Sequence, residues 1–229
     1  MDTGPTTHLE TERKYDAGPD FTMPDFSALT SCYSVAGPDR YELSATYFDT
    51  DDLLLASHRV TLRWRTGGTD DAWHLKLPVR TGTRREVHLP LSLGTDSVPE
   101  QMHAMVADFT DGRPLHPIAL LRTVRTVRRL TGADGSVLAE VADDDVTARR
   151  LGPRAGIGAG DVMRWHEIEV ELVSGSPGVL ETAGKLLVAA GARPSASASK
   201  VSRLLSAGLP APARGGPEAA APRGNAGGR

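Results

Sequence analysis

The sequence predicts a mainly β protein of the α+β class: an antiparallel β barrel of about eight strands with helices packed on its outside. Three observations support this fold class. Apolar and polar residues alternate in eight segments, several of these segments are joined by short turns rich in Gly and Asp, and clear helical patterns are few. Short turns favour antiparallel hairpins, because parallel strands need a longer crossover connection.

The alternating segments are bounded by clusters of Gly, Pro, Asp and Ser, which is typical of strands that end in turns. Residues 66–71 and 131–136 are two such turns. The predicted strands cover residues 8–14, 41–48, 60–65, 72–77, 84–89, 121–130, 137–146 and 165–172.

The clearest helical signal follows the last predicted strand. Ser176 and Pro177 supply an N-cap and a first-turn proline to a helix that carries an apolar stripe and stops at Gly191. Shorter helices are predicted at 24–29, 100–106 and 197–207, and a glycine-rich loop is predicted at 152–160.

The composition is that of an ordinary globular protein. The 229 residues include 26 basic and 29 acidic side chains, and the net charge of −3 argues against a general nucleic-acid binder.

We expect one domain at 1–206 and a disordered tail at 207–229, because Ala, Pro, Gly and Arg offer little surface to bury. With no signal-peptide core and no apolar stretch near the roughly 18 residues that span a bilayer, we expect a cytoplasmic protein without a membrane partner. The single cysteine, Cys32, excludes an internal disulfide and is expected to be an inert thiol.

Charged residues recur at alternate positions of the predicted strands, which places them on one face. One sign dominates in some segments, as in Arg63 and Arg65 or in Glu167, Glu169 and Glu171. These charges can belong to solvated outer faces, or they can line a closed sheet, where so many ions are costly to bury unless a ligand neutralises them. A polyanion with divalent cations would satisfy both signs. The tryptophans are expected on the opposite, apolar faces beneath the helices: Trp64, Trp73 and Trp165.

The segment Glu10-Thr11-Glu12-Arg13-Lys14 resembles the ExExK signature of the CYTH domain, the fold shared by class IV adenylyl cyclases, thiamine triphosphatases and inorganic triphosphatases. The resemblance implies an eight-stranded antiparallel β tunnel whose inner wall binds a triphosphate with its metal ions. Further segments match this family in order and extend the resemblance over about residues 7–205: Tyr47-Phe48-Asp49-Thr50, Leu62-Arg63-Trp64-Arg65, His74-Leu75-Lys76-Leu77-Pro78, Arg84-Arg85-Glu86, Arg125-Thr126-Val127-Arg128-Arg129, Asp143-Asp144, Glu167-Ile168-Glu169 and Ser199-Lys200.

The resemblance also assigns roles to the residues at matching positions. Divalent metal ions, Mg²⁺ or Mn²⁺, are expected to bind carboxylates, which are hard oxygen ligands: Glu10, Glu12, Asp144, Glu167 and Glu169. Phosphate oxygens are expected to bind ammonium and guanidinium groups: Lys14, Arg63, Arg65, Lys76, Arg84, Arg125 and Lys200. The predicted catalytic group is Glu10, Glu12 and Lys14.

Metal-dependent hydrolysis of a linear triphosphate, inorganic or organic, is the activity that the resemblance favours. The expected partner is a small-molecule triphosphate or a polyphosphate rather than a nucleic acid. A conventional nucleotide hydrolase is disfavoured, because the sequence contains no P-loop motif. Two alternatives stay open: a module that binds polyphosphate without turnover, and a class IV adenylyl cyclase, which would need an adenine pocket.

Overall fold

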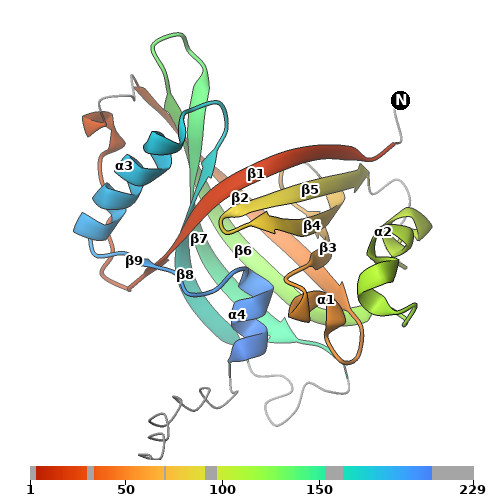
Figure 1. Ribbon diagram of the computed structural model, residues 1–229. Coiled ribbons are helices and arrows are strands. Elements are labelled where there is room, and N and C mark those ends of the chain that lie inside the picture. The colour runs from red at the N-terminus through yellow and green to blue at the C-terminus, as the bar shows by residue number, and fades with distance from the viewer. Residues whose placement is uncertain (1–3, 30–33, 70, 91–96, 153–161, 208–229) are drawn as a thin grey trace, which may run out of the picture.

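A computed structural model describes residues 4–29, 34–69, 71–90, 97–152 and 162–207. Within these ranges eight antiparallel strands form a closed ring, as predicted (Figure 1). The strands are β1 (Thr6–Ala17), β2 (Ser34–Asp49), β3 (Thr61–Thr66), β4 (Ala72–Arg80), β5 (Thr83–Pro90), β6 (His116–Thr131), β7 (Val137–Arg150) and β8 (Met163–Leu172), and a two-residue strand, β9 (Arg193–Pro194), pairs with β1.

The ring runs in the order β5-β4-β3-β2-β6-β7-β8-β1, and β1 closes it by pairing with two strands. The first half of β1, from Thr6 to Thr11, pairs with β5, and the second half, from Glu12 to Ala17, pairs with β8. The strands differ in length from 6 residues in β3 to 16 in β2 and β6, so the ring is not an even barrel.

Helix α3 (Pro177–Ala189) covers the outer face of β1, β7 and β8 (Figure 1). Burial of its apolar stripe against the sheet stabilises this side of the ring. Gly184 lets the helix lie close to β1, because a Cβ atom there would be 2.1 Å from the Tyr15 hydroxyl. The buried cluster includes Tyr15, Val141, Ile168, Val170, Leu180, Ala183 and Leu187.

Helices α1 (Leu54–Ser57) and α2 (Glu100–Thr110) cover the outer face of β3, β4 and β5. The Asp49 carboxylate at the end of β2 accepts hydrogen bonds from the backbone N–H groups of Leu55 and Ala56, at 2.8 and 2.9 Å, which fixes the first turn of α1. The apolar alternation of β3–β5 supplies the other half of this core: Leu62, Trp73, Leu75, Val87 and Leu89 pack with Leu55, Met102 and Val106.

Helix α4 (Lys200–Ser206) closes one end of the ring. Ser199 caps it, with the Ser199 hydroxyl accepting from the Ser202 N–H and the Ser202 hydroxyl accepting from the Ser199 N–H. At this end the inward-facing residues of β2, β6 and β7 are apolar, and they pack against Val201 and Leu204: Ala45, Tyr47, Ala119, Leu121, Val146 and Ala148. The ring is therefore a blind tunnel in its described part.

Three features differ from the sequence-based predictions, and three predicted features lie outside the described residues. The segment predicted as a helix at 24–29 contains only a 3₁₀ turn, η1 (Phe26–Ala28), and α1 was not predicted. The prediction for Trp165 was wrong: it shares the inward parity of Glu167, donates its indole N–H to that carboxylate and packs beside α4. Cys32, the tail at 208–229 and residues 153–160 of the predicted loop lie outside the described residues. No helix in the described part of the chain is long and apolar enough to cross a membrane.

Candidate active site

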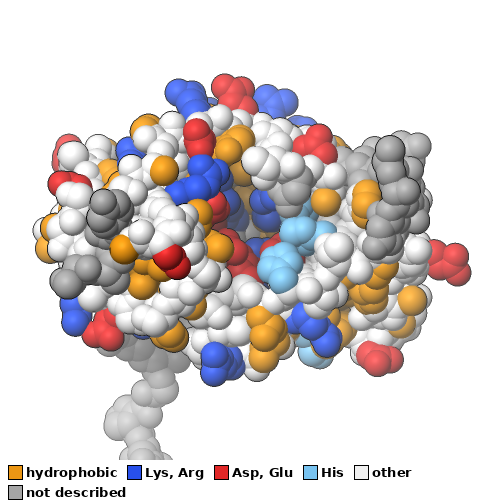
Figure 2. Space-filling model, turned by 90° about the horizontal axis from the view of Figure 1, so that it is seen from above, with side chains coloured by type: hydrophobic (Ala, Val, Ile, Leu, Met, Phe, Trp, Pro, Cys, Tyr) orange, Lys and Arg blue, Asp and Glu red, His pale blue; other side chains and the backbone are white. Residues whose placement is uncertain are grey.

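The tunnel contains a cavity of about 240 Å³ whose wall is mostly polar. Figure 2 shows the hollow from above, with basic, acidic and histidine side chains gathered inside it. The inward-facing interpretation of the strand charges is thus confirmed. Ten predicted site residues line the cavity: Glu10, Glu12, Lys14, Arg63, Arg65, Lys76, Arg84, Arg125, Glu169 and Lys200.

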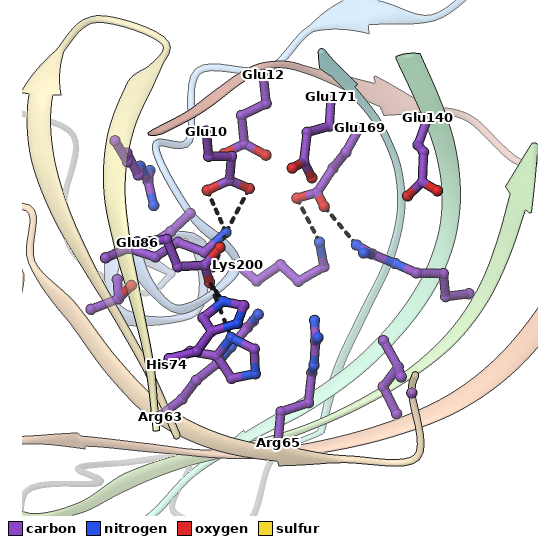
Figure 3. A pocket seen from close by; sticks show the side chains of 18 of the residues that line it. Glu10, Glu12, Arg63, Arg65, His74, Glu86, Glu140, Glu169, Glu171 and Lys200 are labelled. Atoms are coloured by element: carbon purple, nitrogen blue, oxygen red, sulfur yellow. Dashed lines mark hydrogen bonds and ion pairs between the residues drawn. The ribbon is translucent and has the colours of Figure 1, made fainter. Parts of the chain in front are cut away.

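One wall of the cavity carries carboxylates from β1 and β8. The antiparallel register places Glu12 opposite Glu171 and Lys14 opposite Glu169, which brings the acidic residues of two distant segments together. Glu10 and Glu12 are only 3% and 7% exposed. Figure 3 shows Glu10, Glu12, Glu169 and Glu171 side by side on this wall.

Lys14 holds two of these carboxylates together. Its Nζ lies 2.9 Å from a Glu12 oxygen and also donates to Glu169. Burial opposes charge on both partners, but their attraction is stronger, so the pKa of Lys14 is raised and the pKa of Glu12 is lowered.

The facing wall carries cations from β3, β4 and β6. Arg63 donates to the Tyr47 hydroxyl at 2.9 Å, and Arg65 lies beside it (Figure 3). Lys76 donates to both Glu10 oxygens, at 2.7 and 2.6 Å. Burial would lower the pKa of Lys76, but Glu10 and Glu86 raise it above its ordinary value. These groups are charged and point into the cavity, as phosphate binding requires.

Asp144 and Glu167 lie deeper and do not line the cavity, unlike the other predicted metal ligands. Lys200 Nζ approaches Asp144, Glu167 and Glu169 at 2.8, 2.6 and 2.7 Å. Arg125 adds a bidentate pair to Asp144 at 2.8 and 2.6 Å and a bond to Glu169 at 2.6 Å. Oxygens of the three carboxylates lie within 4.8 Å of one another, a spacing that suits a metal ion, but here the Lys200 ammonium lies among them.

The rest of the acidic wall offers carboxyl oxygens to the cavity. Burial, followed by the charges of Glu10 and Glu12, raises the pKa of Glu171 to about 8. Among the described residues, none forms a hydrogen bond or ion pair with the Glu171 carboxyl group. The wall thus holds one carboxyl group that has no cation partner among the described residues, and carboxylate oxygens are hard donors of the kind that divalent cations such as Mg²⁺ bind.

Replacing Glu171 by Gln is expected to change how stability depends on pH in the metal-free protein. Because its pKa is raised in the folded protein, Glu171 contributes to the free energy of unfolding below about pH 4.5. This contribution is lost as the pH rises through about 8. Denaturant unfolding in chelator should show wild type losing stability relative to Glu171→Gln across this range, by at most about 1.4 kcal/mol per pH unit. The exposed Glu42→Gln variant serves as control, and parallel profiles for wild type and Glu171→Gln would contradict the assignment.

Several cavity residues were not among the predicted site residues. Glu171 had a usable signal, since it continues the alternation of Glu167 and Glu169. Glu140 likewise shares the parity of Asp144. A group of histidines gave a weaker signal, because single histidines on separate strands meet only through the strand register: His8, His74 and His88, beside Glu86.

Two curated relatives match most of this chain. Two uncharacterized proteins of Mycobacterium tuberculosis, strains CDC 1551 and H37Rv, are each 37% identical to the chain in an alignment of 222 residues that covers 93% of this chain. The match spans 43% of each relative, so the chain corresponds to less than half their length.

Solved structures share the fold at lower identity. A Bacillus halodurans protein assigned provisionally as an adenylate cyclase superposes with a TM-score of 0.57 at 21% identity, covering 87% of this chain and 99% of that one. A Hippeastrum protein, also assigned provisionally as an adenylyl cyclase but with a dominant triphosphatase activity, superposes with a TM-score of 0.55 at 19% identity, covering 89% and 97%. The model of the CYTH domain matches residues 8–204. The chain therefore belongs to the CYTH domain family.

Proposed function

We propose that this protein hydrolyses a linear triphosphate, inorganic tripolyphosphate or an organic triphosphate, with Mg²⁺ or Mn²⁺ as cofactor. One observation carries the proposal: a wall of carboxylates faces a wall of cations across a single blind cavity of about 240 Å³. A phosphate chain with bound divalent cations has the charge pattern that complements both walls. The dominant triphosphatase activity of the Hippeastrum neighbour is consistent with this assignment.

The acidic wall would hold the metal ions through Glu10, Glu12, Glu169 and Glu171. When bound there, a divalent cation supplies charge neutralisation on the transferring phosphoryl group and lowers the pKa of a coordinated water. Lys14 keeps Glu12 and Glu169 ionised and correctly placed for this task.

The basic wall would bind and orient the phosphate chain. Guanidinium groups form paired, charge-assisted bonds with phosphate oxygens, and ammonium groups add point charges. Phosphoryl transfer needs positioning and electrostatic stabilisation more than a protein nucleophile, so this wall accounts for much of the expected catalysis. Its members are Arg63, Arg65, Lys76 and Arg125, and two further cations line the same cavity: Arg84 of β5 and, at the closed end, Lys200.

Product analysis with ATP separates hydrolysis from the two alternatives. A hydrolase releases phosphate or pyrophosphate without forming cyclic AMP, whereas a cyclase forms cyclic AMP and pyrophosphate in equal amounts. A binding module binds tripolyphosphate, which calorimetry would detect, but releases no product from it. We expect phosphate release without cyclic AMP, and stoichiometric cyclic AMP would replace the proposal with the cyclase.

Arg63→Ala is expected to weaken substrate binding. The guanidinium lies on the cavity wall, and a charge-assisted hydrogen bond contributes about 1.5–3 kcal/mol. This predicts a rise of about 10-fold to 150-fold in the Kd for tripolyphosphate, measured by calorimetry. Arg85→Ala, on the exposed face of β5, is the control, and an unchanged Kd for Arg63→Ala would remove Arg63 from the phosphate site.

A further inference from the structure

Three histidines and one glutamate meet on the cavity wall formed by β1, β4 and β5. Each strand contributes inward-facing members: His8 from β1, His74 from β4, and Glu86 and His88 from β5. The register places His8 opposite Glu86 and His74 opposite His88. Histidine side chains are visible on one side of the hollow in Figure 2, and Figure 3 shows His74 directed toward Glu86.

The Glu86 carboxylate is the centre of this group. One of its oxygens lies 3.3 Å from His8 Nε2, and the other lies 3.3 Å from His88 Nε2 and 3.1 Å from His74 Nδ1. The His8 and His88 rings meet edge to face with centroids 4.9 Å apart. Ligand atoms of His8, Glu86 and His88 all lie within 4.8 Å of one another.

We propose that His8, Glu86 and His88 form a second metal site, specific for a divalent transition-metal cation of the Zn²⁺ class and separate from the carboxylate wall. Two imidazoles and one carboxylate are a ligand set that Zn²⁺ binds and Mg²⁺ does not favour. Ligand atoms about 2.0–2.1 Å from a tetrahedral ion are about 3.3 Å from each other. One Glu86 oxygen lies at that separation from His8 Nε2, and the other lies at the same separation from His88 Nε2.

His74 acts as a positioning residue for this site. It is buried, and its Nδ1 contacts the same Glu86 oxygen that faces His88. A hydrogen bond between this ring nitrogen and the carboxylate would fix the orientation of Glu86 toward the site.

The proposed site and the carboxylate wall are separated by Lys76. Its Nζ lies 2.6 Å from Glu10 and 3.6 Å from Glu86, so its charge is taken up mainly by Glu10. Because His8, Glu86 and His88 all line the cavity, a fourth coordination position would face the lumen and accept water or a phosphate oxygen.

Cobalt and zinc binding test this site independently of enzyme activity. Protein stripped with chelator is loaded with excess Mg²⁺ to occupy the oxygen ligands, and Co²⁺ is added while visible d–d absorption is recorded. We expect one equivalent to bind with the intense spectrum of a four- or five-coordinate site, and Zn²⁺ to displace it. His8→Ala and His88→Ala should each weaken binding at least about tenfold, whereas His58→Ala, on the exposed surface, should not.

Two results would overturn the proposal: no Co²⁺ binding above Mg²⁺, or binding that His8→Ala and His88→Ala leave unchanged while Glu12→Gln abolishes it. The His8 side chain is 44% exposed, so its removal leaves the core untouched and the test does not depend on a damaged fold. Thermal unfolding of each variant checks this directly.

Discussion

Glu12→Gln should lose metal-dependent turnover by more than about 100-fold while keeping its affinity for the phosphate chain. The substitution preserves size but removes a negative charge from the proposed metal site on the acidic wall, where Glu12 faces Glu171 across the β1–β8 pair. Loss of a residue that only supports a metal ligand already costs about 10-fold to 100-fold, and loss of a ligand should cost more. The cations of the opposite wall stay in place, so binding of the phosphate chain in chelator should change little.

The measurement is phosphate release from tripolyphosphate with Mg²⁺, paired with calorimetry of tripolyphosphate in chelator. Glu10→Gln should behave in the same way, because its carboxylate lies on the same wall. Glu42→Gln, exposed on β2, provides the matched control for a lost surface charge. Full turnover in Glu12→Gln would remove this residue from the metal site.

Lys200→Met should lower the free energy of unfolding by about 3–5 kcal/mol at neutral pH. A single ammonium contacts three buried carboxylates, Asp144, Glu167 and Glu169. The variant would leave Arg125 beside Asp144 and Glu169, and Lys14 beside Glu169, but it would remove the ion pair of Glu167. Burial raises the pKa of Asp144, but Arg125 and Lys200 lower it below its ordinary value. A lowered pKa gives stability that is present above the unfolded value and is lost as the pH falls through the folded value.

The difference between wild type and Lys200→Met should therefore shrink in acid, where the carboxylates take up protons. Denaturant unfolding at neutral and acidic pH measures this difference. Lys185→Met is the control: Lys185 is 71% exposed and pairs with Glu181 on the surface of α3, so its loss should cost less than about 1 kcal/mol. A loss for Lys200→Met no larger than that of the control would show that Lys200 does not hold the closed end together.

The strand faces were predictable because alternation depends on local sequence alone. The parity of Glu10 with Glu12 and of Arg63 with Arg65 assigned each pair to one face, and the structure turns those faces inward. Parity did not show how deep in the tunnel each inward-facing side chain lies. Asp144 shares its inward face with Glu140, yet Asp144 lies under Lys200 and Glu140 lies on the cavity wall.

How deep a charged side chain lies in the tunnel depends on α4, a helix near the C-terminal end of the described chain that packs against one end of the ring. The match of Ser199-Lys200 to the family pattern supported a role for Lys200, but the contact of one lysine with three carboxylates is set by tertiary packing. Helix α1 was missed for a related reason. It is only four residues long and is held by the Asp49 carboxylate and by packing of Leu55 rather than by helical periodicity.

The most direct test of the central claim is phosphate release from tripolyphosphate by the wild-type protein, measured with Mg²⁺, with Mn²⁺ and with chelator. The charged cavity predicts metal-dependent release that chelator abolishes, at a rate well above that for ATP if the substrate is inorganic. Tight binding of tripolyphosphate without release under any of these conditions would contradict the triphosphatase and make the tunnel a polyphosphate-binding module.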